Sequence, residues 1–248
     1  MPIVLMSLIV MFVAFLYSSV GFGGATGYLA AMSLFGIPPQ VMTSTALILN
    51  IIVASVSFTS FFRAGHFKLR LLWPFIATSI PAAFLGGLFK LPDQVYFVLL
   101  YAILTLTAIR LIFFSTNLEA KTLKTPSIWI SLLVGFGIGL LSGIVGIGGG
   151  IFLSPIIILA GWGTAKEASI TAAAFIVLNS MGGLVGRIST GNFAFGEFGF
   201  ILIPLGLIGA FAGSYLGAKK LSSLALRRAL GVVMSVAVIN FWSKLFLK

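Results

Sequence analysis

The sequence predicts an all-α polytopic membrane protein, and three observations carry this prediction. Hydrophobic residues make up 60% of the 248 residues and charged residues only 8%, whereas about 25% charged is ordinary for soluble domains. Apolar runs near the roughly 20 residues that a membrane helix needs recur along the whole chain. The second half of the chain also repeats motifs of the first half in the same order. These features leave no room for a separate soluble domain.

Each half of the chain holds five apolar segments. We predict them at 3–20, 27–36, 40–62, 69–89 and 94–114, and again at 128–145, 150–161, 165–187, 197–217 and 224–246. The chain then divides into a first repeat (1–114), a cytoplasmic linker (115–127) and a second repeat (128–248), which form one transmembrane domain. The two short segments cover only about half of a hydrocarbon core some 30 Å thick. They either span the membrane or form re-entrant hairpins with the segments before them.

The clearest internal repeat is a glycine cluster. Val20-Gly-Phe-Gly-Gly24 returns as Val145-Gly-Ile-Gly-Gly149. Three further matches follow in the same order: Thr45-Ala46 with Thr171-Ala172, Gly65-His66-Phe67 with Gly191-Asn192-Phe193, and Ala83-Phe-Leu-Gly-Gly87 with Ala210-Phe-Ala-Gly-Ser214. One chance match would mean little, but four matches in one order indicate a duplication.

The distribution of basic residues predicts that the two halves are inverted in the membrane. Short loops rich in Lys and Arg stay in the cytoplasm, and three basic clusters alternate with poorer loops. These clusters are Arg63, Lys68 and Arg70; Arg110, Lys121 and Lys124; and Lys219, Lys220, Arg227 and Arg228. Placing all three in the cytoplasm puts Gly65 inside, its counterpart Gly191 outside, and both termini outside. The same rule explains the net charge of +11, so we expect no nucleic-acid partner.

The glycine clusters are predicted to break helices and to form a binding site. In lipid, a break is tolerated only where it is buried in protein or lines a water-filled cavity, and matching breaks in two halves point to a transporter's substrate site. The helix that starts after each break presents unpaired N–H groups that bind anions without a charged side chain. The candidate residues are Gly21, Gly23, Gly24, Gly146, Gly148 and Gly149.

Membrane glycines have two other interpretations, close helix packing and nucleotide binding. Close helix packing through small residues is common in membranes, and we favour it for Gly86, Gly87, Gly213 and Gly217. Nucleotide binding through G-x-G-x-x-G would require glycine at positions 26 and 151 and a βαβ context. Those positions hold Thr26 and Ile151, so this interpretation fails.

Polar residues inside the apolar segments supply the remaining candidates. They are Ser44, Thr45 and Asn50 in the first half, and Thr171 and Asn179 in the second. Hydroxyls and amides can donate hydrogen bonds to an anion while adding no charge, although a single hydroxyl can instead bond back to its own helix. Thr45 and Thr171 stand at equivalent positions, whereas Asn50 and Asn179 do not, which weakens a symmetric two-amide site.

The apolar segments contain few charged residues and no set of residues typical of an enzyme. The acidic residues Asp93, Glu119, Glu167 and Glu197 sit at segment ends or in loops, so no buried proton relay is visible. We expect Arg187, near a segment end, to reach toward the membrane interface. The chain has no cysteine and a single His in a loop, so we expect neither an enzyme, nor a metal site, nor a cofactor.

The duplicated Val-Gly-x-Gly-Gly break, the Thr-containing start of the following segment and a length near 250 residues together resemble the TauE/SafE family. The resemblance covers nearly the whole chain and both halves. It implies a carrier of sulfite, sulfonates or other sulfur-containing organic anions. It implicates the glycines of each break with Thr45 in one half and Thr171 in the other. The second half departs from the hydroxyl-rich pattern, because Ile170 stands where the first half has Ser44.

We therefore expect a secondary transporter of small anions in the prokaryotic inner membrane. It would work by alternating access around a midplane site formed by the two breaks. A passive anion channel and a non-transporting membrane subunit of a sulfur-metabolism complex are the alternatives. The expected partners are a small anionic substrate, such as a sulfur oxoanion or an organosulfonate, and the lipid bilayer, and a homo-oligomer is left open.

Overall fold

The computed structural model describes residues 2–63, 65–113 and 124–217, together with 235, 238–240 and 242–243. The described residues form nine helices of 10 or more residues and no β-strand, which confirms the predicted all-α class. The helices are α1 (Pro2–Ser19), α2 (Ala25–Leu34), α3 (Pro39–Phe62), α4 (Leu69–Leu88), α5 (Asp93–Phe113), α6 (Ile128–Val145), α7 (Gly150–Leu159), α8 (Ala165–Ser189) and α9 (Gly199–Gly217).

The helices fall where the apolar runs predicted them. Five of them, α3, α4, α6, α8 and α9, are long and apolar enough to cross a membrane. Shorter apolar helices include α7 and most of α1 and α5. The predicted linker up to residue 123 lies outside the described residues. So do most of the segment 224–246 and the basic cluster at 219–228.

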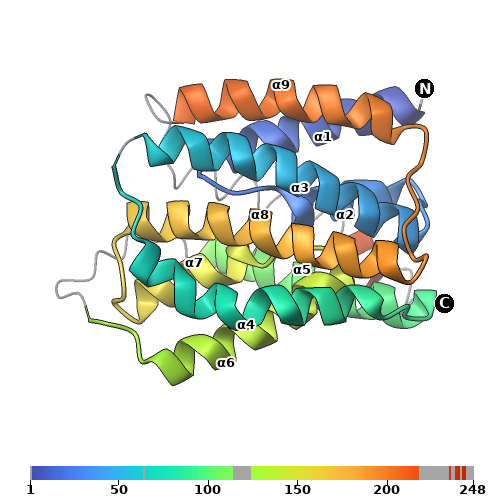
Figure 1. Ribbon diagram of the computed structural model, residues 1–248. Helices are drawn as coiled ribbons and strands as arrows, with labels where there is room; N and C mark the ends of the chain where they lie inside the picture. The colour runs from blue at the N-terminus through green and yellow to red at the C-terminus, as the bar shows by residue number, and fades with distance from the viewer. Residues whose placement is uncertain are drawn as a thin grey trace.

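The short helices belong to hairpins that enter and leave at one end of the bundle. In Figure 1, α1 starts at the right, the chain breaks, and α2 returns to the right. The pair α6 and α7 starts and returns at the left. We call the right-hand end, which holds residue 2, the N-terminal end of the bundle. With 10 residues each, α2 and α7 are about 15 Å long, as expected of re-entrant segments rather than crossings.

Glycines let the backbones of neighbouring helices touch. A Cβ atom added at Gly143 of α6 would lie against the carbonyl oxygen of Ala83 in α4. One added at Gly213 of α9 would lie against the carbonyl oxygen of Phe15 in α1. The same holds for Gly86 against α6 and for Gly87 against α8, so the packing interpretation of Gly86, Gly87 and Gly213 is confirmed.

Contacts between the two halves are reciprocal. Helix α4 of the first half packs on α6 of the second, and α9 of the second half packs on α1 of the first. The Ser18 hydroxyl donates to the carbonyl of Ala210 at 2.7 Å. The counterparts of these two residues, Gly143 and Ala83, also lie against each other, and the Ala83 carbonyl faces the position of a Gly143 side chain. Each half therefore supplies the packing partner for the hairpin of the other half.

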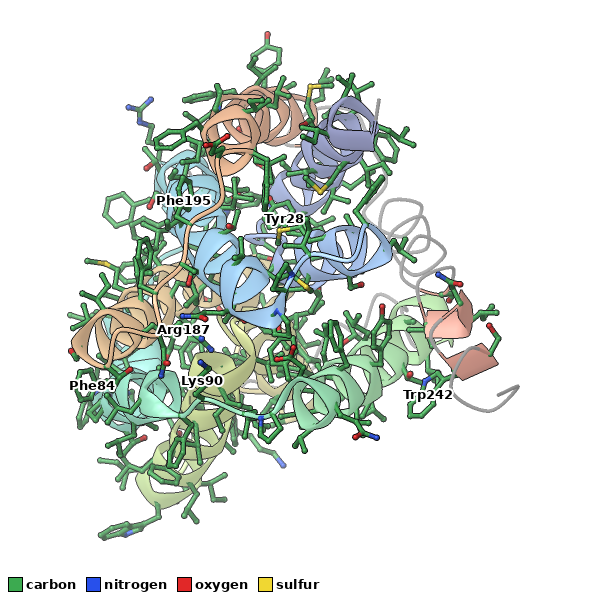
Figure 2. All side chains as sticks on the ribbon, turned by 90° about the vertical axis from the view of Figure 1, so that its right-hand side faces the viewer. Tyr28, Phe84, Lys90, Arg187, Phe195 and Trp242 are labelled. Carbon is green, nitrogen blue, oxygen red and sulfur yellow. The ribbon has the colours of Figure 1, made fainter. Side chains whose placement is uncertain are left out.

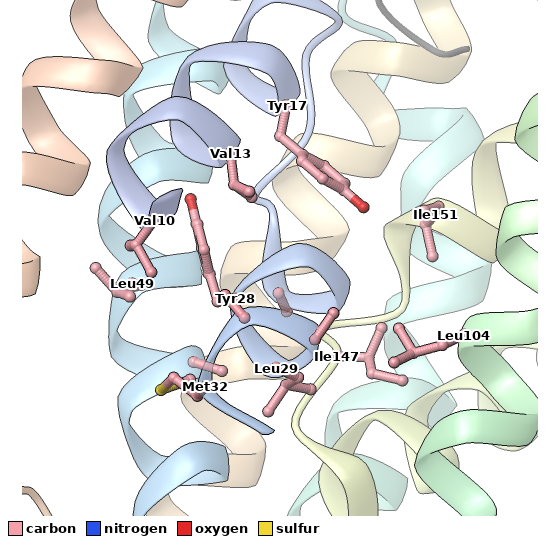
Figure 3. Packing of buried hydrophobic residues seen from close by; sticks show 14 of the residues in the cluster. Val10, Val13, Tyr17, Tyr28, Leu29, Met32, Leu49, Leu104, Ile147 and Ile151 are labelled. Carbon is pink, nitrogen blue, oxygen red and sulfur yellow. The ribbon is translucent and has the colours of Figure 1, made fainter. Parts of the chain in front are cut away.

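The larger buried apolar cluster encloses both glycine breaks. It includes Phe22 from the first break and Ile147 from the second. Figure 3 shows Leu29 of α2 beside Ile147, with Leu104 of α5 on its far side. The two breaks are therefore held inside the protein, as a break at membrane depth requires.

The close approach of α4 and α6 predicts different effects for two glycine substitutions in α6. A methyl group at Gly139 would clash with the Ser79 backbone, whereas Gly137 has nothing within 4 Å of its added Cβ atom. We expect Gly139→Ala to lower the free energy of unfolding by about 1–3 kcal/mol. Gly137→Ala should leave it unchanged or slightly raised. Thermal unfolding of the detergent-solubilised protein measures both, and equal effects of the two substitutions would contradict the packing.

Candidate functional site

Both glycine clusters interrupt helices, as predicted. The first separates α1 from α2 and the second separates α6 from α7. Gly21 and Gly24 have φ of +86° and +105°, and Gly146, Gly148 and Gly149 have φ between +75° and +85°. Residues with a Cβ atom rarely adopt these angles, so both breaks depend on glycine for their backbone path.

Gly23 is required for a different reason, close approach. Its φ is not positive, but an added Cβ atom would lie 2.6 Å from Oδ1 of Asn50 and 2.9 Å from Cγ2 of Ile176. At Gly148, an added Cβ atom would lie 2.7 Å from Nδ2 of Asn50 and 3.0 Å from the same Ile176 methyl group. The two breaks therefore meet at the same two side chains, one from α3 and one from α8.

Asn50 joins the two breaks by hydrogen bonds. Its Oδ1 accepts from the backbone N–H of Ala25, the first residue of α2, at 3.0 Å. Its Nδ2 donates to the carbonyl of Ile147 in the second break at 3.2 Å and to Oγ of Ser180 in α8 at 3.4 Å. Asn50 is completely buried. One N–H group at the start of α2 is thus already bonded within the protein.

Three of the predicted site residues have a buried polar atom without a hydrogen-bond partner in the part of the chain that the structure describes. Thr45 Oγ1, Thr171 Oγ1 and Asn179 Oδ1 have no hydrogen-bond partner among the described residues. The Asn179 amide nitrogen donates to the carbonyl of Phe175 in its own helix at 2.8 Å. Leaving a buried polar atom unpaired costs about 1–3 kcal/mol. The two threonine hydroxyls could donate to an anion, whereas the Asn179 oxygen can only accept a hydrogen bond, so at Asn179 the donor would be the second N–H of the amide.

Ser44, the remaining polar candidate, is already engaged. Its hydroxyl donates to the carbonyl of Gln40 at 2.9 Å and accepts from the backbone N–H of Ala194 at 3.3 Å. Ala194 lies in the loop before α9, so these contacts lead away from the breaks. Among the outer glycines of the breaks, Gly21 approaches Ser169, Gly24 approaches Tyr28, Gly146 approaches Thr43 and Gly149 approaches Ser142.

Arg187 does not reach toward the interface, and that expectation is wrong. The side chain is 5% exposed, and its Nη2 donates to the carbonyls of Ile144 at 2.7 Å and Gly143 at 3.2 Å. These carbonyls end α6 just before the second break, where the helix dipole favours a cation. The signal in the sequence is the small-residue stretch Gly182, Gly183 and Gly186, which brings α8 against its neighbours and leaves a long side chain inside the protein.

Arg187 lines a cavity of about 200 Å³ at the N-terminal end of the bundle. The cavity is bounded by Pro38, Pro39, Gln40, Thr43, Phe89, Lys90, Leu91, Asp93, Tyr96, Ile144, Arg187 and Asn192. A second cavity, of about 440 Å³, lies at the opposite end beside Lys68, Arg70 and Lys124. Within the described part of the chain, no three His, Cys, Asp or Glu residues gather where they could hold a metal ion.

Comparison with known proteins identifies the family. The family model described as "Sulfite exporter TauE/SafE" matches residues 6–241. "Probable membrane transporter protein y4hK" of Sinorhizobium fredii is 36% identical over 232 residues, which cover 91% of this chain and 92% of that protein. "Probable membrane transporter protein ORF9" of a Sinorhizobium species is 30% identical over 237 residues, covering 92% and 85% of the two chains.

A more distant organism has a partial match. "Probable membrane transporter protein MJ0441" of Methanocaldococcus jannaschii is 35% identical over 112 residues, or 42% of each chain. No solved structure matches the chain. The family match spans both glycine breaks and all nine described helices apart from the first residues of α1. The chain therefore belongs to the TauE/SafE family of multi-pass membrane transporters.

Proposed function

We propose that this protein is a secondary transporter of small anions, namely sulfite, sulfonates or related sulfur oxoanions, with its substrate site at the two glycine breaks. The observation that carries the proposal is the bridge made by Asn50 between the start of α2 and the carbonyl of Ile147. Broken helices that meet inside a transporter mark its substrate site. The family supports transport, and the chemistry of the site supports an anion.

Neutral donors and helix starts would bind the anion. The hydroxyls of Thr45 and Thr171 come from equivalent positions and have no partner among the described residues. Helices α2 and α7 begin at the breaks and direct the positive ends of their dipoles toward them. The acidic residues Asp93 and Glu167 stand in the first turns of α5 and α8, and neither belongs to the two breaks.

Alternating access would follow from an inverted repeat. The reciprocal packing of α4 on α6 and of α9 on α1 supports this relation between the halves. So do the two hairpins, which open toward opposite ends of the bundle (Figure 1). One half moving against the other would expose the breaks to each side in turn. Arg63, Lys68 and Arg70 lie at the end opposite residue 2, consistent with an N-terminus outside the inner membrane.

Transport measurements separate this proposal from its alternatives. Purified protein in liposomes should take up radiolabelled sulfite or methanesulfonate with saturation, and the same anion loaded inside should accelerate uptake. Conductance without saturation or acceleration would instead favour a passive channel. A protein that moves neither anion, and whose thermal unfolding neither anion shifts, would favour a non-transporting membrane subunit.

Filling the point where the breaks meet should stop transport. We expect Gly23→Leu and Gly148→Leu to reduce the initial rate at least about tenfold, because each side chain would occupy the space beside Asn50 and Ile176. The matched control is Gly36→Leu. Gly36 has a φ of +70° but nothing within 4 Å of an added Cβ atom. Membrane insertion should be normal in all three variants. Full transport by both Gly23→Leu and Gly148→Leu would show that the site is misplaced.

The two buried asparagines should behave differently. Asn50→Ala strands the Ala25 N–H and the Ile147 carbonyl, so we expect the free energy of unfolding to fall by about 2–4 kcal/mol along with transport. Asn179 bonds only within its own helix, so Asn179→Ala should cost less than about 1 kcal/mol. The variant should also raise the KM for the anion, because it removes the second amide N–H, which would donate to the anion. Thermal unfolding and saturation kinetics measure the pair. The assignment is contradicted by an Asn179→Ala variant with unchanged KM.

A further inference from the structure

We propose that the cavity beside Arg187 and Lys90 is a second oxoanion-binding site, separate from the breaks, that receives the anion at the N-terminal end of the bundle. Only its role as an entrance rests on the proposed transport function; the binding of an anion there does not. The proposal rests on the uncompensated charge of Arg187, the polar lining of the cavity and its position against the second break.

Within the described part of the chain, the buried charge of Arg187 has no counter-ion. Its guanidinium donates to two backbone carbonyls, and its Nε has no partner there. The salt bridge among the described residues joins Lys68 to Glu167 at the opposite end of the bundle. A buried charge without an opposite charge is costly. An anion in the adjoining cavity would supply that charge.

The lining of the cavity favours a small oxoanion. Lys90 stands beside Arg187 in Figure 2, which looks onto this end of the molecule. Asp93 also lines the cavity but forms no salt bridge with Lys90 or Arg187. The lining therefore carries two positive charges and one negative charge. The planar guanidinium suits the oxygens of a sulfonate, carboxylate or phosphate. A volume of about 200 Å³ lies below the range of drug-sized ligand pockets, about 300–1,000 Å³.

Polar groups connect this cavity to the second break. The Tyr96 hydroxyl donates to the carbonyl of Val145 at 3.2 Å and accepts from Oγ1 of Thr43 at 3.1 Å. Both side chains line the cavity, and Thr43 also touches the position where a Cβ atom of Gly146 would stand. An anion held at Arg187 therefore lies one residue layer from the break. This is the placement expected of a site that the substrate occupies before it reaches Asn50.

The absence of cysteine from the sequence permits a direct test of the local charge. In a Gln40→Cys variant, a single thiol would line the cavity. We would measure its labelling by anionic sulfonatoethyl and cationic trimethylammonioethyl methanethiosulfonate, each normalised to a free thiol in solution. We expect the anionic reagent to react faster by at least about tenfold, because a positively lined cleft concentrates anions to this degree. Methanesulfonate should slow the labelling.

Charge-removing variants decide whether Arg187 causes this preference. Arg187→Gln in the Gln40→Cys background should abolish both the preference and the protection by methanesulfonate. Lys90→Gln should reduce the preference in the same direction, and because Lys90 is exposed, this variant is expected to fold even if Arg187→Gln does not. The matched control is Arg63→Gln, which removes an exposed cation at the opposite end and should change neither rate.

Each result of the labelling experiments either supports or overturns the anion site beside Arg187. An anionic preference that depends on Arg187 or Lys90, together with protection by methanesulfonate, supports the site. Equal normalised rates, a preference that neither variant reduces, or attraction without protection each overturns it. Labelling requires no transport, so a protein that moves no anion can still show this site. Failure of the proposed transport function would appear separately in the liposome assay.

Discussion

A helix break at membrane depth exposes backbone N–H and carbonyl groups that lipid cannot satisfy, so the protein must supply their partners. In this protein, side chains from neighbouring helices do so at both breaks. Asn50 bonds the first N–H of α2 and the carbonyl of Ile147. Tyr28 donates to the carbonyl of Gly23 at 2.8 Å, and Tyr96 donates to that of Val145. The breaks can therefore stay unwound inside the bundle, and a single amide of α3 bonds to both hairpins.

Small residues make this arrangement sterically accessible. The carbonyls of Ala83 and Phe15 lie where side chains at Gly143 and Gly213 would stand, so helices from opposite halves approach at backbone distance. The hydrophobic effect does little to drive helices together within lipid, and association there depends on close packing and hydrogen bonds. Close packing on both sides thus holds the two hairpins against each other. The same close packing buries Arg187 and brings its guanidinium to the carbonyls at the end of α6.

The sequence was sufficient for the helices and the breaks but not for the roles of individual polar residues. Run lengths and glycine clusters are local signals, and the helix bounds and both interruptions follow from them. The contrast between Asn50 and Asn179 is not local. Both are completely buried amides on long helices, yet only the neighbours brought by folding give Asn50 three partners outside its own helix. The prediction for Arg187 was wrong for the same reason. Hydropathy places this residue at a segment end but does not show which carbonyls lie near it. Ser44 and Thr45 are adjacent, yet the Ser44 hydroxyl bonds its own helix and the loop before α9, whereas the Thr45 hydroxyl has no partner among the described residues.

The duplication preserves the backbone more closely than the chemistry. The position equivalent to Asn50 in the second half is Ile176, and the two side chains contact both breaks from opposite sides. The position equivalent to Arg187 in the first half is Phe61, whose ring approaches Gly21. One break therefore adjoins a buried cation and the other an aromatic ring. In the proposed transporter, an anion that reaches the second break would pass the Arg187 guanidinium, whereas one that reaches the first break would pass the ring of Phe61. Because binding energy depends on these contacts rather than on the backbone path, we expect the two sides to differ in affinity even though the helices that form them are repeated.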